Sequence, residues 1–278
     1  MFKPADFELM SIDEVWKGPV PPAGFVSIAE LEGANGDYFG WYWPLGRERK
    51  PPVICVYFHD EPSLRPVCSS TGIFHRWCES VDSPWSGEFD AAEPEFAPAL
   101  INRARQHLGS GEVDRAIECA QRACEVFPDS SAYWHLLAGQ LRRVGAREAS
   151  VEAALHAYRS SWCFGAPDAG VLSVLRSGKS MEKFADDPVV KRSDRLTTRF
   201  GGDKENANYP LIQECIDEYF ARGDALSALR LSQNYALMIL VWETISFRER
   251  YRFDGEAWQR DFAALCSRHL GDSRRSVE

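Results

Sequence analysis

The stretches Ala104-Arg-Gln-His-Leu-Gly-Ser-Gly111 and Ala138-Gly-Gln-Leu-Arg-Arg-Val-Gly145 hold alanine and glycine at matching positions, and the offset between them is thirty-four positions. Ala123 recurs as Ala157 at the same offset. A fixed period of this length is typical of stacked helical hairpins, in which each hairpin packs on the next. Such arrays present a long surface to other macromolecules. The repeat therefore indicates partner binding before any catalytic motif is sought.

Helical hairpins are predicted on both sides of each repeated glycine. The first pair of helices is expected over residues 100–109 and 113–126, and the second over 133–144 and 147–159. A third, looser pair is expected over 212–220 and 226–235, because Gly223 and Ala228 repeat the spacing of Gly111 and Ala116. Residues 165–208 show no such pattern, and residues 236–270 are expected to form closing helices, which arrays of this kind need.

These hairpins resemble the tetratricopeptide family. The second repeat supplies its packing positions with Trp134, Leu137, Ala138, Leu141, Gly145, Ala154 and Ala157, and the first with Leu100, Ala104, Gly111, Ala116, Ala123 and Pro128. Three residues depart from the pattern: Arg103, His107 and Ser150. The resemblance implies that Arg105, His135, Arg142 and Arg143 lie on or near a concave face. There Arg142 and Arg143 would bind carboxylates of a partner, or else form solvated helix ends.

The N-terminal region has a different pattern, with aromatic and β-branched runs that favour strands. Strands are expected over residues 25–31, 37–43, 53–58 and 64–68, and a helix over 73–78. The apolar run Val53-Ile-Cys-Val-Tyr-Phe58 predicts a central strand that is covered on both sides. An acidic, proline-containing linker over 85–98 separates this region from the helices.

Part of the N-terminal region resembles the SUKH superfamily. The likeness lies in Asn35-Gly-Asp-Tyr-Phe-Gly-Trp-Tyr-Trp-Pro-Leu-Gly46, the strand Pro52-Val-Ile-Cys-Val-Tyr-Phe-His-Asp60, and the Ser69-Ser70 step into a helix that carries Phe74. The N-terminal helices usual in that superfamily are not evident in residues 1–24. The resemblance implies a bacterial immunity protein that neutralises a cognate toxin by occluding its active site.

Charge is unevenly distributed along this chain of net charge −9. Residues 1–90 hold 14 acidic and 7 basic side chains, whereas the rest of the chain holds 27 and 25. An acidic N-terminal region disfavours nucleic acid and favours a basic protein partner, such as a basic toxin domain. Asp60 and Glu61 are candidate contacts, and solubility alone is the alternative reason for this acidity.

Trp41 and Trp43 are further candidates for partner binding, because tryptophan is enriched in interface hot spots. Strand alternation places these two side chains on one face and Tyr42 on the other. Since one face of the sheet must be core, part of this aromatic cluster is expected to be structural.

Motifs for other kinds of site are missing from the sequence. No phosphate loop, nucleophile elbow or His-Glu-x-x-His motif occurs, so no catalytic residues, cofactor or metal are predicted. His59-Asp60-Glu61 is expected to be a strand end and turn. No apolar run is long enough for a membrane span. The eight cysteines include no Cys-x-x-Cys pair, which favours a reducing, cytoplasmic location.

Taken together, the sequence predicts an α+β protein. A small SUKH-like mixed α/β domain over residues 1–84 precedes the linker, and a tetratricopeptide-like helical array with capping helices fills 99–278. The predicted function is non-catalytic binding of a protein partner, as an immunity protein that occludes a toxin. The alternative is a cytoplasmic adaptor or scaffold that binds a peptide or protein. The toxin's identity and the oligomeric state do not follow from the sequence.

Overall fold

A computed structural model describes residues 22–30, 37–80, 93–199, 206–243 and 245–271. The N-terminal part is a four-stranded antiparallel sheet in the order β1-β2-β3-β4. The strands are β1 (Phe25–Glu30), β2 (Tyr38–Tyr42), β3 (Val53–Phe58) and β4 (Ser63–Cys68), and helix α2 (Thr71–Ser80) follows. The strands predicted from sequence are confirmed, with β3 over the expected residues. Most of the acidic linker, and the start of the chain where the SUKH superfamily has its N-terminal helices, lie outside the described residues.

Both faces of the sheet are covered. Trp41 pairs with Ile54, and Ile54 pairs with Cys68, so these three residues form a row across one face. That face packs against α2 through Phe74 and Trp77. The opposite face belongs to the main core that it shares with the helices, and its members include Phe25, Tyr42, Cys55 and Leu64. The expectation that β3 is buried on both sides is confirmed, since Ile54 and Cys55 are both fully buried.

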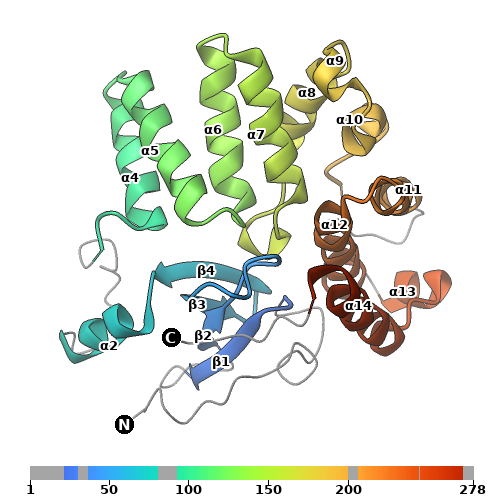
Figure 1. The fold of residues 1–278 in the computed structure, drawn as a ribbon, viewed down its shortest axis with the longest axis horizontal. Coiled ribbons are helices and arrows are strands. Elements are labelled where there is room, and N and C mark those ends of the chain that lie inside the picture. Colours follow the sequence, from blue (N-terminus) through green and yellow to red (C-terminus); the bar gives the residue numbers. More distant parts are fainter. Residues whose placement is uncertain (1–21, 31–36, 81–92, 200–205, 244, 272–278) are drawn as a thin grey trace.

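The rest of the chain forms helices that curve around the sheet (Figure 1). Two hairpins come first: α4 (Ala97–Gly109) with α5 (Val113–Val126), and α6 (Ser131–Arg143) with α7 (Arg147–Arg159). Helix α4 begins three residues before its predicted start, because Pro98 in the first turn needs no hydrogen-bond partner for its nitrogen. Helix α6 begins two residues before its predicted start at residue 133.

Residues 160–207, much of which lacked a clear pattern, contain short helices. They are the 3₁₀ turn η2 (Trp162–Phe164) and helices α8 (Ala169–Gly178), α9 (Glu182–Ala185) and α10 (Pro188–Arg192). A third hairpin follows, made of α11 (Asn208–Ala221) and α12 (Ala225–Leu237). The chain then passes through the π-helical turn η3 (Met238–Trp242) into α13 (Ile245–Tyr251) and α14 (Gly255–Leu270).

The three hairpins share one turn. Gly111, Gly145 and Gly223 have φ of 79°, 80° and 78°, in the left-handed region that glycine adopts without strain. The residue after each glycine donates its backbone N–H to the carbonyl five positions earlier, as in the bond of 2.9 Å from Ala146 to Leu141. This is the bond pattern of a Schellman motif. The loose third repeat therefore has the same turn geometry as the other two.

Small buried residues let the helices of each hairpin approach closely. Ala104, Ala138 and Ala116 are fully buried. Ser150, which departs from the alanine usual at its position, is also buried, and its hydroxyl donates to the backbone oxygen of Ala138 at 2.8 Å. The serine is accommodated because its polar group gains a partner inside the hairpin.

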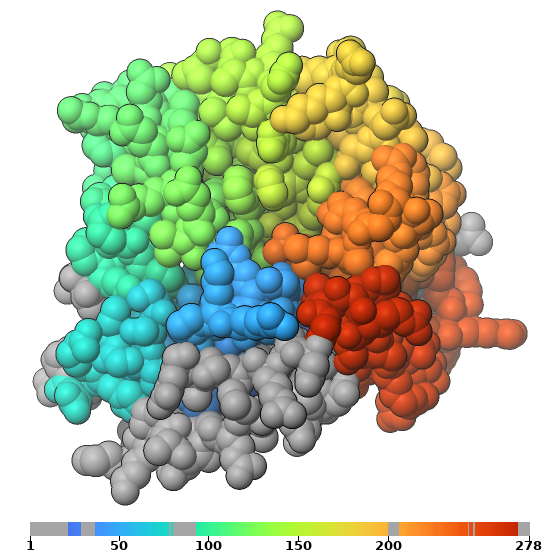
Figure 2. Space-filling view, viewed as in Figure 1, coloured from blue at the N-terminus to red at the C-terminus, as the bar shows by residue number. Residues whose placement is uncertain are grey.

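The sheet is joined to the array through buried polar and apolar contacts. The Tyr42 hydroxyl donates to Asp129 Oδ2 at 2.7 Å, and Asp129 Oδ1 lies 3.4 Å from Arg230 Nη2. Arg230 also donates to the backbone oxygen of Leu45. Leu45 packs in a cluster with Phe262 of α14. Figure 2 shows the β2–β3 region (blue) enclosed between the hairpins above it and α14 (red) beside it.

Candidate protein-binding surface

The first helices of the successive units, α4, α6 and α8, carry most of the residues that the tetratricopeptide resemblance selects. We call them the A helices, and α5 and α7 the B helices. On α6, His135, Gly139 and Arg142 are spaced by four and three residues, so they follow one stripe of the helix. We define the A-helix face as Arg105 of α4 together with His135, Gly139, Arg142 and Arg143 of α6.

Two residues of this face reach from α6 toward α8. Arg142 is exposed, and its Nη1 donates to the Ser173 hydroxyl at 3.2 Å. His135 Nε2 lies 3.3 Å from Asp168 Oδ1. Asp168 is the N-cap of α8, where the same oxygen accepts the backbone N–H groups of Gly170 and Val171. The face is therefore continuous from α6 to the start of α8.

Arg105 and Arg143 point to solvent. Arg105 is exposed, and its guanidinium donates to Asn102 Oδ1 of its own helix at 3.3 Å. Arg105 precedes Gly139 by one full repeat, so the two occupy the same place in successive units. Arg143 is exposed next to Arg142. The structure thus brings the four predicted array residues to neighbouring A helices, with their polar groups accessible.

Trp41 and Trp43 lie elsewhere. Their side chains are 1% and 4% exposed, their rings are 6.3 Å apart, and Trp41 donates its indole N–H to the Thr71 hydroxyl at 2.9 Å. They share a face, as alternation predicts, but that face packs on α2. Their expected role in binding is corrected to a structural one, because a buried indole offers no surface to a partner.

Asp60 and Glu61 are exposed in the turn after β3. Asp60 Oδ1 lies 2.9 Å from His59 Nε2, and His59 Nδ1 lies 2.9 Å from Asp37 Oδ1. The hydrogen bond to Asp37 raises the pKa of His59. The contact between His59 and Asp37 joins the end of β3 to the start of β2. The acidic pair thus lies in the turn between β3 and β4 and is not part of the A-helix face.

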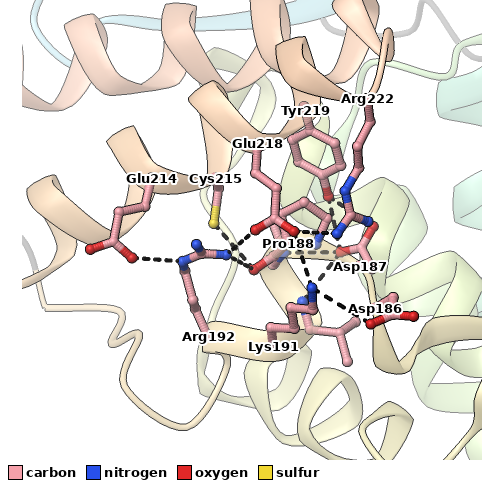
Figure 3. A network of polar contacts seen from close by, with 12 residues as sticks. Asp186, Asp187, Pro188, Lys191, Arg192, Glu214, Cys215, Glu218, Tyr219 and Arg222 are labelled. Atoms are coloured by element: carbon pink, nitrogen blue, oxygen red, sulfur yellow. Dashed lines mark hydrogen bonds and ion pairs between the residues drawn. The ribbon is translucent and has the colours of Figure 1, made fainter.

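A dense polar network, which the sequence reasoning missed, joins α10 and the turn before it to α11 (Figure 3). It extends to α7 and α12 through Arg159. Asp187 caps α10 and accepts the Tyr219 hydroxyl at 2.9 Å and Arg159 Nη2 at 2.5 Å. Arg159 also donates to Ser227 of α12. The Asp187-Pro188 pair is a helix-start signal that could have located α10. The sequence does not indicate that Arg159 and Tyr219 would be the partners of Asp187.

Glu218 is the second centre of this network. It accepts hydrogen bonds from Lys191 at 3.1 Å and Arg192 at 2.8 Å and also contacts Arg222. Partial burial acts to raise the pKa of Glu218, but these cations outweigh it and lower the pKa to about 2. The acids of the network are matched by bases, so the network fixes helices and is not arranged to hold a charged ligand.

The described residues include no group of three or more His, Cys, Asp or Glu side chains that could hold a metal ion. Over the same part of the chain, no helix has the length and apolarity needed to cross a membrane. The seven cysteines whose side chains are described are free thiols.

Comparisons with known proteins separate the two resemblances. A tetratricopeptide repeat model matches residues 97–139, which supports the repeat assignment. The model that matches residues 10–87 is the YfbP N-terminal domain, and the YfbP C-terminal domain matches 199–278. The SUKH resemblance has no support among these matches.

Two known proteins show how far the likeness extends. The YfbP protein of Escherichia coli strain K12 is 42% identical over 266 residues, which cover 95% of this chain and 94% of that protein. A solved chain from the APC/C hetero-tetramer Cut9-Hcn1 aligns with a TM-score of 0.27 and 16% identity, over 66% of this chain and 35% of its own. This chain thus spans about a third of that one, and at this TM-score the likeness supports no argument. The alignment with the bacterial protein covers nearly the whole of both chains, and this chain therefore belongs to the YfbP family.

Proposed function

We propose that this protein is a non-catalytic scaffold whose helical array binds a protein partner. The observation that carries the proposal is the pair of tetratricopeptide-like hairpins, α4–α7, with an accessible stripe of polar residues on the A helices. Repeats of this kind bind other macromolecules through surfaces that span several units. Arg105 of α4 and Arg142 of α6 are both exposed, on the A helices of successive repeats.

The toxin-occluding role receives no such support. It followed from the SUKH resemblance, and the family model that covers this region is a different one. Its proposed aromatic contacts are buried. An adaptor role needs only the repeat surface, and the tetratricopeptide match lies in that part of the chain.

Site-specific photo-cross-linking in the full chain tests the scaffold role. A photoreactive amino acid is placed at the exposed Gln106 of α4 or Ala132 of α6, beside the A-helix face, and, as matched controls, at the exposed Glu118 of α5 and Glu148 of α7. We expect the same partner to be cross-linked in cells from both A-helix positions and from neither control. Equal cross-linking from all four positions, or none from the A helices, would reject the proposal.

A further inference from the structure

The A helices have an unusual charge composition for so acidic a protein. Helices α4, α6 and α8 contain no aspartate or glutamate, whereas the B helices α5 and α7 mix both signs. The arginines of the A helices are Arg103, Arg105, Arg142, Arg143 and Arg176. With a net charge of −9 for the whole chain, this part of the array is a local basic surface.

Most of these arginines lack an acidic partner within the described part of the chain. Arg103 is paired with Glu95, whereas the hydrogen bonds that Arg105 and Arg142 donate to described residues go to neutral groups, Asn102 and Ser173. No carboxylate among the described residues lies within ion-pair distance of Arg105, Arg142 or Arg143. By contrast, the exposed Arg115 and Arg122 on α5 are both ion-paired. The carboxylate of Asp168 borders the face, and it is engaged by His135 and the start of α8.

Gly139 gives an independent indication of a ligand. It lies inside α6, where glycine is less favourable than alanine by about 0.5–1 kcal/mol. A Cβ added at Gly139 would meet nothing within 4 Å, so no packing among the described residues requires a glycine there. A bare helix backbone one turn from Arg142 on α6 allows another chain to approach closely.

We propose that the A-helix face binds an extended, acidic segment of a protein partner. Carboxylates of that segment pair with the guanidinium groups of Arg105, Arg142 and Arg143, which suit bidentate contacts. The backbone of the segment passes over Gly139. This inference rests on the proposed scaffold function and specifies the chemistry of its partner. An acidic peptide is favoured over nucleic acid because the face lies on tetratricopeptide-like hairpins, a repeat architecture that presents extended binding surfaces to proteins.

The test uses labelled peptides and the full chain. The probe is a fluorescein-labelled Glu-Ser repeat of about 12 residues, and its control is the Gln-Ser repeat of the same length, with binding followed by anisotropy. We expect binding of the acidic peptide alone. Arg142→Glu combined with Arg105→Glu should weaken it at least about tenfold, and raising the salt from about 50 to 500 mM should weaken it further.

Two further variants test whether binding depends on this face and not on the overall charge of the protein. Arg147→Glu makes the same change at an exposed position of α7 that has no ion pair among the described residues, and it should leave the affinity unchanged. Gly139→Trp adds bulk without charge and should abolish binding. Thermal melting of each variant checks that the fold is intact, since all four positions are outside the buried core.

The possible results distinguish this inference from the scaffold proposal. If the cross-linking experiment finds a partner but Arg105→Glu and Arg142→Glu do not weaken it, the scaffold stands and the acidic-segment inference fails. Equal binding of the Gln-Ser peptide also overturns the inference. Tighter binding of a single-stranded oligonucleotide than of the Glu-Ser peptide would assign the face to nucleic acid instead.

Discussion

Tyr42 shows how one side chain links two parts of the chain. Its ring packs between Phe127 and Phe164, with centroids 6.2 and 5.0 Å away, and its hydroxyl donates to the buried Asp129. Burial, and then the charge of Asp129, raise the pKa of Tyr42 well above its usual value. The phenol therefore remains protonated and is held as a donor at physiological pH.

Tyr42→Phe should lower the free energy of unfolding by about 1–3 kcal/mol, because it leaves a buried carboxylate without its strongest hydrogen bond. Tyr57→Phe is the matched control. Tyr57 is half-buried on the same sheet, its hydroxyl has no hydrogen bond within the described residues, and its loss should change stability by less than about 0.5 kcal/mol. Urea denaturation measures both, and equal losses would contradict this role for Tyr42.

His59 gives a prediction about pH. Its hydrogen bond to Asp37 raises its pKa in the folded protein, whereas the unfolded chain keeps a value of about 6.5. The stabilising contribution is thus fully present below about pH 6.5 and is lost as the pH rises through the folded pKa. The stability advantage of wild type over His59→Gln should therefore shrink as the pH is raised above about 6.5. Denaturant melts of both proteins measure it, and a constant difference would show that His59 does not titrate as proposed.

At the scale of elements, local sequence features predicted the hairpin turns and several helix bounds correctly. The hairpin turns need a left-handed residue, and glycine marks them at Gly111 and Gly145 in the sequence itself. Helices α5 and α7 have their predicted bounds. Helices α9 and α10 were missed because, with four and five residues, they are too short for a periodic pattern, and Asp187 at the start of α10 is held by the distant Arg159. Helix α8 did carry a signal that was overlooked, since Val171, Leu172, Val174 and Leu175 have helical spacing.

Two glycines of the second hairpin should respond oppositely to the same substitution. Gly145 has φ of 80°, so Gly145→Ala should destabilise the protein by about 1–2 kcal/mol through backbone strain alone. Gly139 is helical and open, so Gly139→Ala should stabilise it by about 0.5–1 kcal/mol. Thermal melting of the two variants tests both signs. A loss of stability in Gly139→Ala would mean that the space over α6 is filled within the folded chain.

At the scale of the molecule, the sequence predicted the two kinds of structure but not their docking. Burial on both faces of β3 indicated that something covers the sheet, yet nothing near Tyr42 in the sequence names Asp129 or Arg230. The candidate binding residues also fall into two groups, those that could be predicted from sequence alone and those that could not. The array positions followed from the repeat and are accessible, whereas Trp41 and Trp43 needed the three-dimensional packing to be recognised as core.

The shared core implies that the sheet and the hairpins unfold together. Asp129, between α5 and α6, contacts both β2 and α12, so opening either side exposes the same buried carboxylate. In native-state hydrogen exchange, the most protected amides of β3 and α6 should therefore report equal free energies of opening. Arg230→Ala removes the cation beside Asp129 and should lower the value for β3 by about 3 kcal/mol, while Arg147→Ala, at an exposed position, should change neither. If β3 already opens at a much lower free energy than α6 in the wild-type protein, the sheet is an independent unit that only rests on the array.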